Sequence, residues 1–307
     1  MIGIDVGAHT LHIHDTDTGE VIKLPTPQAE TYLRTKPPTT IVLEPTGHYG
    51  LAIAELAYLA GHQVLLATDN DTWALRRVVR RAHKTDRLDA TMLSSLAQLA
   101  NTAPDIVKHA LTPYANVRPL FLARRSAYTA RKLVTLAAAI QNRLRQHPDP
   151  ELQELARTLK KLAEHYQQQT IEATPPDVIA RLTTIPGVSA PLAALLWTYL
   201  GNAERFSSPN HAVSYVGLAP RNFPTSGATT RPPTRRRTAA LLATHLHMYA
   251  LRVAANPHKY DRFGQTYLRL RTKGGRIALH AVKRQLVRVA FALLRNKETY
   301  VSSQEAP

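Results

Sequence analysis

Cysteine is absent from the 307 residues of this chain. Disulfide bonds and thiolate metal sites are therefore excluded, and any bound metal must be held by oxygen or imidazole ligands. Long apolar runs are also missing, since a stretch such as Pro191–Leu200 is too short to span a bilayer. The apolar N-terminus follows no basic segment and contains Asp5, so we expect a buried strand there and not a signal peptide. These absences predict a cytoplasmic protein with no membrane partner.

Acidic side chains are scarce beyond the first quarter of the chain. Residues 1–75 contain nine acidic and three basic side chains, whereas residues 76–307 contain thirteen acidic and 36 basic ones. The net charge of the whole chain is +17. Between Arg221 and Lys297 seventeen Lys or Arg residues accompany one acid, Asp261. A surface this basic attracts polyanions by counterion release, which favours nucleic acid as the partner. The alternative is a basic surface that only keeps the protein in solution. An anionic membrane is disfavoured because the charge does not follow one amphipathic helix.

The first hundred residues alternate between strand and helix patterns. Short apolar and β-branched runs predict five strands, the first three joined as a meander: Ile2–Val6, Leu11–His14, Val21–Leu24, Thr40–Glu44 and Gln63–Ala67. Helical periodicity and cap signals predict helices over Pro27–Arg34, Tyr49–Ala60, Asp71–Arg81 and from just after Lys84. This order predicts an α/β domain over residues 1–104.

The remaining two thirds of the chain have helical patterns. Two apolar seams predict a pair of antiparallel helices that forms a stalk or dimerisation arm: Leu133, Leu136, Ile140 and Leu144, then Leu152, Leu155, Leu159 and Leu162. We assign this connector and oligomerisation arm to residues 105–176, where Pro175 and Pro176 mark a boundary. A mostly helical domain over residues 177–300 and a polar tail over residues 301–307 complete the predicted organisation.

Four carboxylates occupy positions that suggest metal binding. Asp5 lies in an otherwise apolar strand and Glu44 ends another, where a charge needs a partner or a metal. Asp86 and Asp89 are three residues apart, so one helical face carries both. Together the four would repel one another unless cations neutralise them, which suits one or two Mg²⁺ ions or Mn²⁺. Alternatively, Asp5 faces solvent, Glu44 caps a turn, and the helical aspartates pair with neighbouring basic residues.

Other motifs admit two interpretations each. A Pro-Gly turn at Ile185–Val188, between two helical stretches, could direct backbone N–H groups at a phosphate or simply join the helices. The aromatic residues of the basic region could stack on bases or pack in the core: Tyr249, Tyr260, Phe263 and Tyr267. His12 and His14 share a strand face, and we interpret both as surface residues because no third ligand stands at a metal-binding spacing.

The segments around the carboxylates resemble a known family. Asp5 in Gly-Ile-Asp-Val-Gly, Glu44 in Leu-Glu-Pro-Thr-Gly, and the string Lys-Thr-Asp-Arg-Leu-Asp-Ala at residues 84–90 are similar to the core of the Piv-like DEDD transposases of insertion sequence family 110. The resemblance continues through Ala212–Pro220 to Thr225-Ser226-Gly227. It implies a ribonuclease-H-like fold, similar to the RuvC Holliday-junction resolvase, for residues 1–104 and a C-terminal transposase domain in which Ser226 matches the proposed nucleophile.

This resemblance implies a mechanism and partners. It implies a metal-supported attack by Ser226 that forms a covalent protein–DNA intermediate, followed by strand exchange between double-stranded element ends and target. It also implies a structured non-coding guide RNA (a bridge RNA) and a homo-oligomer, a dimer or tetramer, in which Ser226 of one protomer works with the carboxylates of another. The basic residues that we expect to contact nucleic acid are Lys84, Arg87, Arg221, Arg231, Arg235, Arg236, Arg237, Arg271, Lys273 and Arg276. The family's lysine-rich, glycine-containing turn is replaced here by Pro232–Arg237.

Alternatives to a transposase follow from the same residues. In a metal-dependent nuclease or junction resolvase, water attacks the phosphodiester and Ser226 is structural; Thr225 and Ser214 are competing nucleophiles. Asp5–Thr10 also resembles the first phosphate-binding turn of sugar-kinase-like ATPases, but the further glycine-rich segments of that fold are not found. A non-catalytic nucleic-acid-binding protein would leave the spaced carboxylates without a purpose.

Overall fold

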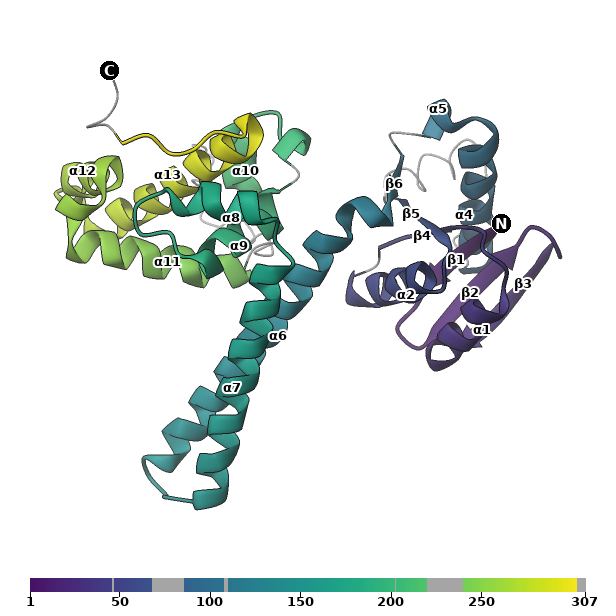
Figure 1. Cartoon of the computed structure of the whole chain (residues 1–307), viewed down its shortest axis with the longest axis horizontal. Helices are drawn as coiled ribbons and strands as arrows, with labels where there is room; N and C mark the ends of the chain where they lie inside the picture. The colour runs from purple at the N-terminus through teal and green to yellow at the C-terminus, as the bar shows by residue number, and fades with distance from the viewer. Residues whose placement is uncertain (46, 68–85, 108–109, 202, 220–239, 303–307) are drawn as a thin grey trace, which may run out of the picture. The chain divides into compact units, whose positions relative to one another are not determined.

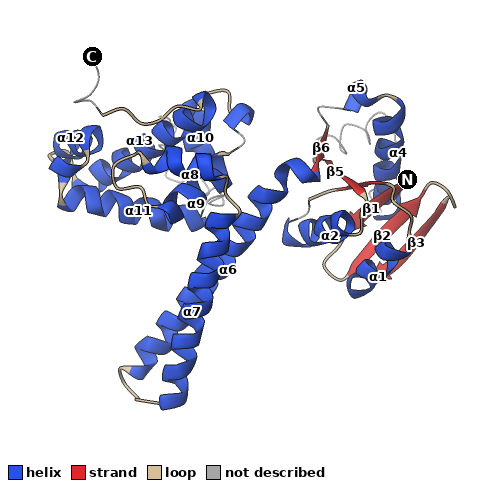
Figure 2. Cartoon of the chain, viewed as in Figure 1, coloured by secondary structure: helices blue, strands red, loops and turns tan. Residues whose placement is uncertain are grey.

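The computed structural model describes residues 1–45, 47–67, 86–107, 110–201, 203–219 and 240–302 (Figure 1). These residues fold into two compact units, Met1–Pro119 and Leu120–Pro307. The first is an α/β unit and the second is helical (Figure 2). The predicted helix over Asp71–Arg81 lies outside the described residues. No helix within the described ranges has both the length and the apolar character needed to cross a bilayer.

A six-stranded mixed sheet forms the first unit, with the strand order β3-β2-β1-β4-β5-β6. The strands β1 to β3 pair antiparallel as the predicted meander, β1, β4 and β5 run parallel, and β6 is antiparallel to β5. Their bounds are β1 Ile2–Val6, β2 Thr10–Asp15, β3 Glu20–Pro25, β4 Thr40–Leu43, β5 Gln63–Ala67 and β6 Leu111–Pro113. The five predicted strands are therefore confirmed, and β6 is a short sixth strand that the sequence pattern did not predict.

Helices cover this sheet. Every residue of β4 is buried, as expected of a parallel strand covered on both faces. Helix α4 packs against β1 and β2, and α2 contacts β1, β4 and β5. The helices of the first unit are η1 Thr26–Gln28, α1 Ala29–Thr35, α2 Gly47–Leu59, α4 Asp86–Thr102 and α5 Pro104–Val107.

Gly3 allows α4 to approach β1 closely. A Cβ atom at this position would overlap the backbone oxygen of Ala90 and the backbone nitrogen of Ser94. Both atoms belong to α4, so a side chain at residue 3 would displace the helix. Gly3 therefore fixes the distance between the strand that carries Asp5 and the helix that begins at Asp86.

The variant Gly3→Ala tests this close approach. We expect its free energy of unfolding to fall by about 3 kcal/mol, because overlap with backbone cannot be relieved by rotating a side chain. Denaturant titration measures the change. Gly275→Ala is the matched control, since no atom lies within 4 Å of a Cβ there, and its stability should be unchanged or slightly higher. Equal stability of Gly3→Ala and the parent chain would contradict the role assigned to Gly3.

The second unit is built from helices alone among its described residues. Two long antiparallel helices form an arm: α6 Tyr114–Leu144, which starts in the first unit, and α7 Pro150–Glu172. The remaining helices of this unit are α8 Pro176–Thr183, α9 Ala190–Leu200, η2 Ala203–Arg205, α10 Pro209–Tyr215, α11 Ala240–Ala255, η3 Pro257–Lys259, α12 Asp261–Arg271 and α13 Gly275–Asn296. All of them except η3 contribute side chains to one apolar core. The division into a connector ending at residue 176 and a separate domain from residue 177 stays a prediction.

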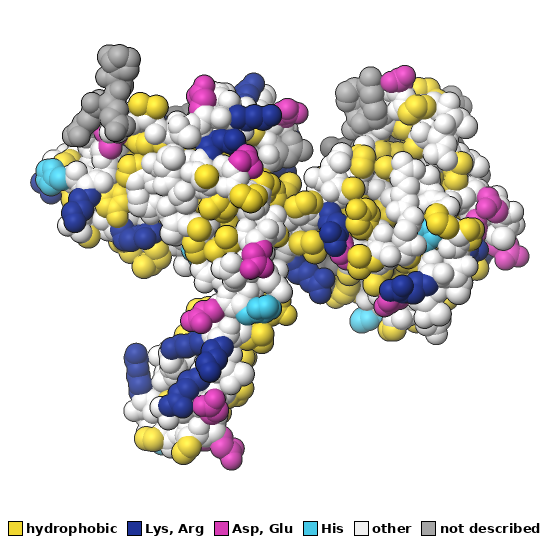
Figure 3. Space-filling model, in the orientation of Figure 1, with side chains coloured by type: hydrophobic (Ala, Val, Ile, Leu, Met, Phe, Trp, Pro, Cys, Tyr) yellow, Lys and Arg dark blue, Asp and Glu magenta, His cyan; other side chains and the backbone are white. Residues whose placement is uncertain are grey.

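The seam between the two arm helices differs from the predicted one. Leu159 is buried as predicted, and four further seam residues are half-buried: Leu133, Ile140, Leu144 and Leu152. The other three, Leu136, Leu155 and Leu162, are exposed by 51%, 46% and 42%. Three small side chains of the same helices are buried instead: Ala137, Ala156 and Ala163 are each less than 5% exposed. Alanine lets two helices approach more closely than leucine does, so the seam passes through the alanines and leaves leucines beside it. Figure 3 shows hydrophobic side chains along one edge of this arm and Lys and Arg side chains gathered near its tip.

Candidate active site

Asp5 faces helix α4 from the middle of the sheet. Side chains alternate along a strand, so Asp5 shares the face of Gly3, the residue in contact with α4. Ile2, Ile4 and Val6 point to the opposite face and are buried. Asp5 itself is half-buried and makes interactions within the fold. The strand pattern that predicted a constrained carboxylate therefore places it beneath a helix and not in open solvent.

Helix α4 brings two aspartates to the same face of the sheet. The helix begins at Asp86, so Asp86 and Asp89 both lie in its first turn, where negative charge is favoured by the helix dipole. The two differ in exposure: the Asp86 side chain is 63% exposed, whereas Asp89 is 7% exposed and makes interactions within the fold. Asp86 is thus the aspartate of this pair that is open to a ligand from solvent.

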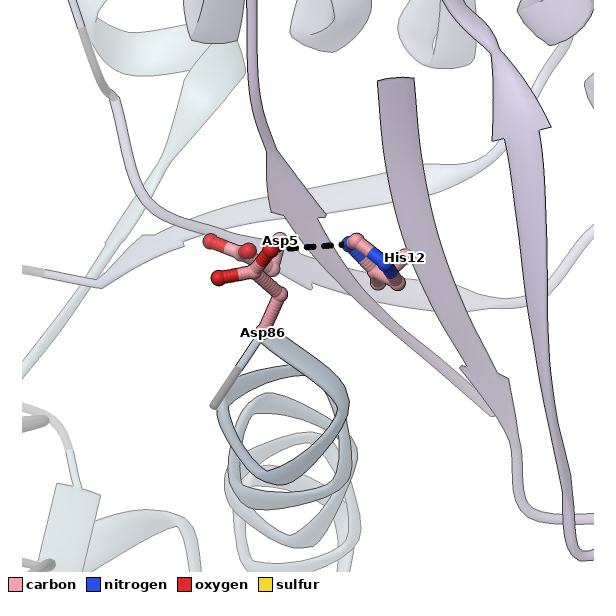
Figure 4. A group of neighbouring side chains, drawn as sticks. All are labelled: Asp5, His12 and Asp86. Atoms are coloured by element: carbon pink, nitrogen blue, oxygen red, sulfur yellow. Dashed lines mark ion pairs between the residues drawn. The ribbon is translucent and has the colours of Figure 1, made fainter. Parts of the chain in front are cut away.

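Asp5 and Asp86 meet a third side chain, His12 of β2. One ligand atom from each of the three residues lies within 4.8 Å of the others, and Nδ1 of His12 is 3.6 Å from Oδ2 of Asp86. Figure 4 shows the strand residues Asp5 and His12 side by side above the end of α4 that carries Asp86. We refer to these three residues as the Asp–His–Asp cluster. It joins three elements that are separate in the sequence.

The interpretation of His12 and His14 as surface residues is wrong. The side chain of His12 is only 12% exposed. The Nδ1 atom of His14 forms a 2.6 Å hydrogen bond with the Ser94 hydroxyl of α4. A signal for His12 was present in the sequence. In a hairpin turning around Gly7–His9, Asp5 pairs with His12, as the register shows. Counting residues outward on both sides of the predicted turn identifies Asp5 and His12 as cross-strand partners.

Glu44 lies next to Asp5 in the sheet but outside the Asp–His–Asp cluster. The parallel register pairs Ile4 with Leu43, and the next residues are Asp5 and Glu44. Gly50 of α2 lies against the Glu44 backbone, since a Cβ at Gly50 would come within 2.6 Å of the Glu44 carbonyl oxygen. The structure thus brings Glu44 to the same end of the sheet as Asp5. Neither Glu44 nor the buried Asp89 belongs to the group of ligand atoms within 4.8 Å.

The cluster has the donor chemistry of a divalent-cation site. Carboxylate oxygens are the protein ligands that Mg²⁺ and Mn²⁺ prefer, and imidazole nitrogen is accepted by Mn²⁺ and later transition metals. Two carboxylates and one imidazole within 4.8 Å therefore fit a metal. Glu44 follows the strand next to Asp5, and Asp89 lies one helical turn after Asp86. Two carboxylates as close as those of Asp5 and Asp86 repel each other, and a cation bound among them would relieve that repulsion.

The predicted nucleophile and several basic residues lie outside the described part of the chain: Lys84, Arg221, Thr225, Ser226, Arg231, Arg235, Arg236 and Arg237. Four other predicted contacts are placed and exposed: Arg87 on α4, and Arg271, Lys273 and Arg276 around the turn between α12 and α13. Ser214, the competing serine, is exposed on α10. Exposure leaves these side chains available to a phosphate backbone.

The Pro-Gly turn between α8 and α9 is held by aromatic packing. The Tyr249 hydroxyl donates a 3.0 Å hydrogen bond to the Pro186 carbonyl, and Gly187, at φ +77°, faces the Tyr260 ring. This packing favours the simple helix–helix turn over a phosphate-binding one. Burial raises the pKa of Tyr249 well above its usual range. Tyr249 and Phe263 are fully buried, while Tyr260 and Tyr267 pack against the same core, which favours packing over base stacking.

Comparison with known proteins covers most of the chain. Residues 2–147 match the family model of the DEDD transposases of the IS110 type, described as a transposase, and residues 179–267 match the model of the transposase IS116/IS110/IS902 family. The chain is 22% identical over 269 residues to a pilin gene-inverting protein of Moraxella bovis, with 85% of this chain and 81% of that protein covered. It is 26% identical over 260 residues to the transposase for insertion sequence element IS1328 of Yersinia enterocolitica, with coverages of 75% and 76%.

These matches decide between the enzyme classes. Both models describe transposases, and between them they contain the carboxylates of the first unit and the serine region of the second. The sugar-kinase-like ATPase and the non-catalytic binding protein are therefore set aside. The convergence of acidic residues in the first unit and the family matches lead to one conclusion: this chain is a DNA transposase and recombinase of the IS110 family.

Proposed function

We propose that this transposase cuts and rejoins double-stranded DNA with a metal-bound carboxylate tetrad and a serine nucleophile. Asp5, Glu44, Asp86 and Asp89 would hold one or two Mg²⁺ ions, and Ser226 would attack the phosphodiester. The observation that carries the proposal is the meeting of Asp5 and Asp86, which come from β1 and α4 and have ligand atoms within 4.8 Å of each other. When bound, the metal would activate the attacking oxygen and stabilise the leaving one.

Each part of this proposal has its own support. The strand order β3-β2-β1-β4-β5, with an antiparallel meander followed by parallel strands, supports the ribonuclease-H-like fold. The family match over residues 179–267 includes Ser226 and supports its role as nucleophile. Arg221 and Arg231, on either side of Ser226 in sequence, would hold the phosphate by charge-assisted hydrogen bonds. The segment Pro232–Arg237, which replaces the family's lysine-rich turn, keeps positive charge close to Ser226 in the sequence.

The partners are proposed on the same basis. Net charge and the exposed basic residues around the α12–α13 turn support binding of double-stranded DNA and of a structured guide RNA. The exposed leucines beside the arm seam support an apolar contact between copies of the chain, in a dimer or tetramer. In such an oligomer Ser226 of one protomer would act with the tetrad of another.

Metal dependence is the test of this function. Cleavage and joining of element-end DNA by the purified protein are measured in Mg²⁺ or Mn²⁺, with and without the co-purified RNA, and activity is expected when the RNA is present. We expect chelation by EDTA to lower the cleavage rate by at least about 10³-fold, because metal stabilisation contributes several kcal/mol to the transition state. Re-addition of Mg²⁺ should restore the rate, and Ca²⁺ serves as the control for charge alone. Cleavage that persists in EDTA would contradict the carboxylate–metal mechanism.

A further inference from the structure

His12 is placed to bind the same metal as the aspartates. We propose that His12 is a direct metal ligand through Nδ1, which makes the centre a mixed carboxylate–imidazole site. This inference rests on the proposed function, and adds a ligand that lies outside the four carboxylates of the tetrad. It follows from the Asp–His–Asp cluster, in which the imidazole and both carboxylates converge from β2, β1 and α4.

The distances in the cluster are close to those of a coordinated ion. Two ligand atoms that each lie about 2.1 Å from one cation are separated by about 3.0 Å when adjacent and about 4.2 Å when opposite. The His12–Asp86 separation of 3.6 Å falls between these values, and the largest separation in the cluster is within 4.8 Å. A small rotation of the Asp86 side chain, which is 63% exposed, would close the remaining gap.

Strand pairing holds His12 in place before any metal binds. Its backbone is paired with that of Asp5, and its side chain is only 12% exposed beneath α4. The position of the imidazole is therefore fixed by the sheet, whereas Asp86, in the first turn of α4, can adjust. A fixed nitrogen facing two carboxylates is a partly assembled ligand set.

His14 provides an internal comparison. It lies on the same face of β2, opposite Gly3, but its Nδ1 is occupied by a 2.6 Å hydrogen bond with the Ser94 hydroxyl. His12 also faces α4, but its Nδ1 lies 3.6 Å from a carboxylate oxygen of Asp86, and a carboxylate oxygen of Asp5 lies within 4.8 Å of both side chains. Among the described residues, the group of possible metal ligands includes His12 but not His14.

An imidazole ligand changes which cation the site prefers. Mg²⁺ strongly favours oxygen ligands, whereas Mn²⁺ accepts imidazole nitrogen more readily. We therefore expect this transposase to bind Mn²⁺ more tightly than Mg²⁺. Exchange of His12 for aspartate would supply an oxygen at the same position and should shift the preference toward Mg²⁺.

The experiment measures binding of Mn²⁺ to the whole chain by electron paramagnetic resonance. The signal of unbound Mn²⁺ gives the dissociation constant, and pulsed measurements detect magnetic coupling between the bound Mn²⁺ and the ¹⁴N nucleus of a ligand. We expect the parent protein to show this coupling. His12→Ala should lose the coupling and bind Mn²⁺ at least about tenfold more weakly, while His12→Asp should lose the coupling but retain binding and gain Mg²⁺ affinity. His9→Ala, which removes an exposed histidine of the turn between β1 and β2, is the matched control and should behave as the parent does.

The outcomes separate this inference from the proposed function. Persistent ¹⁴N coupling, or unchanged Mn²⁺ affinity, in His12→Ala would overturn the role of His12. If Asp5→Asn abolishes Mn²⁺ binding in that case, the carboxylate site still stands. If Asp5→Asn also leaves binding unchanged, the proposed metal site fails as well. Because His12→Asp retains a polar side chain of similar reach, its loss of coupling with retained Mn²⁺ binding supports the ligand role even where the alanine variant folds poorly.

Discussion

Alanine at position 226 is expected to abolish strand joining and to reduce DNA cleavage by at least about 10³-fold, because the hydroxyl of Ser226 is the attacking group. The parent protein should leave a covalent protein–DNA species on denaturing gels of labelled element-end DNA, and Ser226→Ala should not. DNA binding should be unchanged, since the phosphate-holding arginines remain.

Two variants serve as matched controls for the serine. Ser214→Ala removes the exposed competing serine of α10, and Thr225→Ala removes the hydroxyl next to Ser226. Both should retain joining and the covalent species. Cleavage at the parent rate by Ser226→Ala, with no covalent species in either protein, would favour the metal-dependent nuclease in which water attacks.

Asp5→Asn is expected to reduce cleavage by about 10³-fold as well, for a different reason. Asparagine keeps the shape of the side chain but removes one of the negative charges that hold the cation, and loss of several kcal/mol of transition-state stabilisation corresponds to this factor. Supercoiled substrate containing the element ends, incubated with saturating Mg²⁺, measures the rate. The covalent species should disappear together with cleavage.

Stability distinguishes a lost metal ligand from a damaged fold. In the absence of metal, Asp5→Asn should be as stable as the parent or more stable, because one charge is removed from a set of like charges. With metal at 100 times its dissociation constant the parent should gain about 2.7 kcal/mol and the variant should not. Asp17→Asn, at a carboxylate that is 84% exposed, is the control and should match the parent in both respects. If metal raises the free energy of unfolding of Asp5→Asn as much as that of the parent, Asp5 is not a ligand of the metal.

The strands and the candidate carboxylates could be predicted from local patterns. Ile2–Val6 and Gln63–Ala67 were predicted with their observed bounds, because a short apolar run is a local property. The strand β6 was not predicted, because its formation depends on a contact with another strand and not on a local pattern. Leu111–Pro113 is too short to show alternation, and it is a strand only because it pairs with β5.

The arm shows where periodicity stops being sufficient. Leucines at positions 155 and 162 and alanines at 156 and 163 each recur at helical spacing, so both patterns describe a seam. Which one is used depends on how closely α6 approaches α7. The alanines are buried and the leucines are exposed, a choice set by the partner helix and not by α7 itself.

The amino-acid sequence by itself indicated the family, the succession along the chain of five of the six strands of the first unit, and the candidate acidic residues, since these depend on motifs and on short-range pattern. Tertiary structure alone decided which of those residues meet. Gly3 permits α4 to approach β1, the hairpin register sets His12 opposite Asp5, and the two together place Asp86 beside both. The pairing of Asp5 with His12 follows from a short hairpin, but the contact with Asp86 depends on the packing distance between α4 and the sheet, which no local pattern encodes.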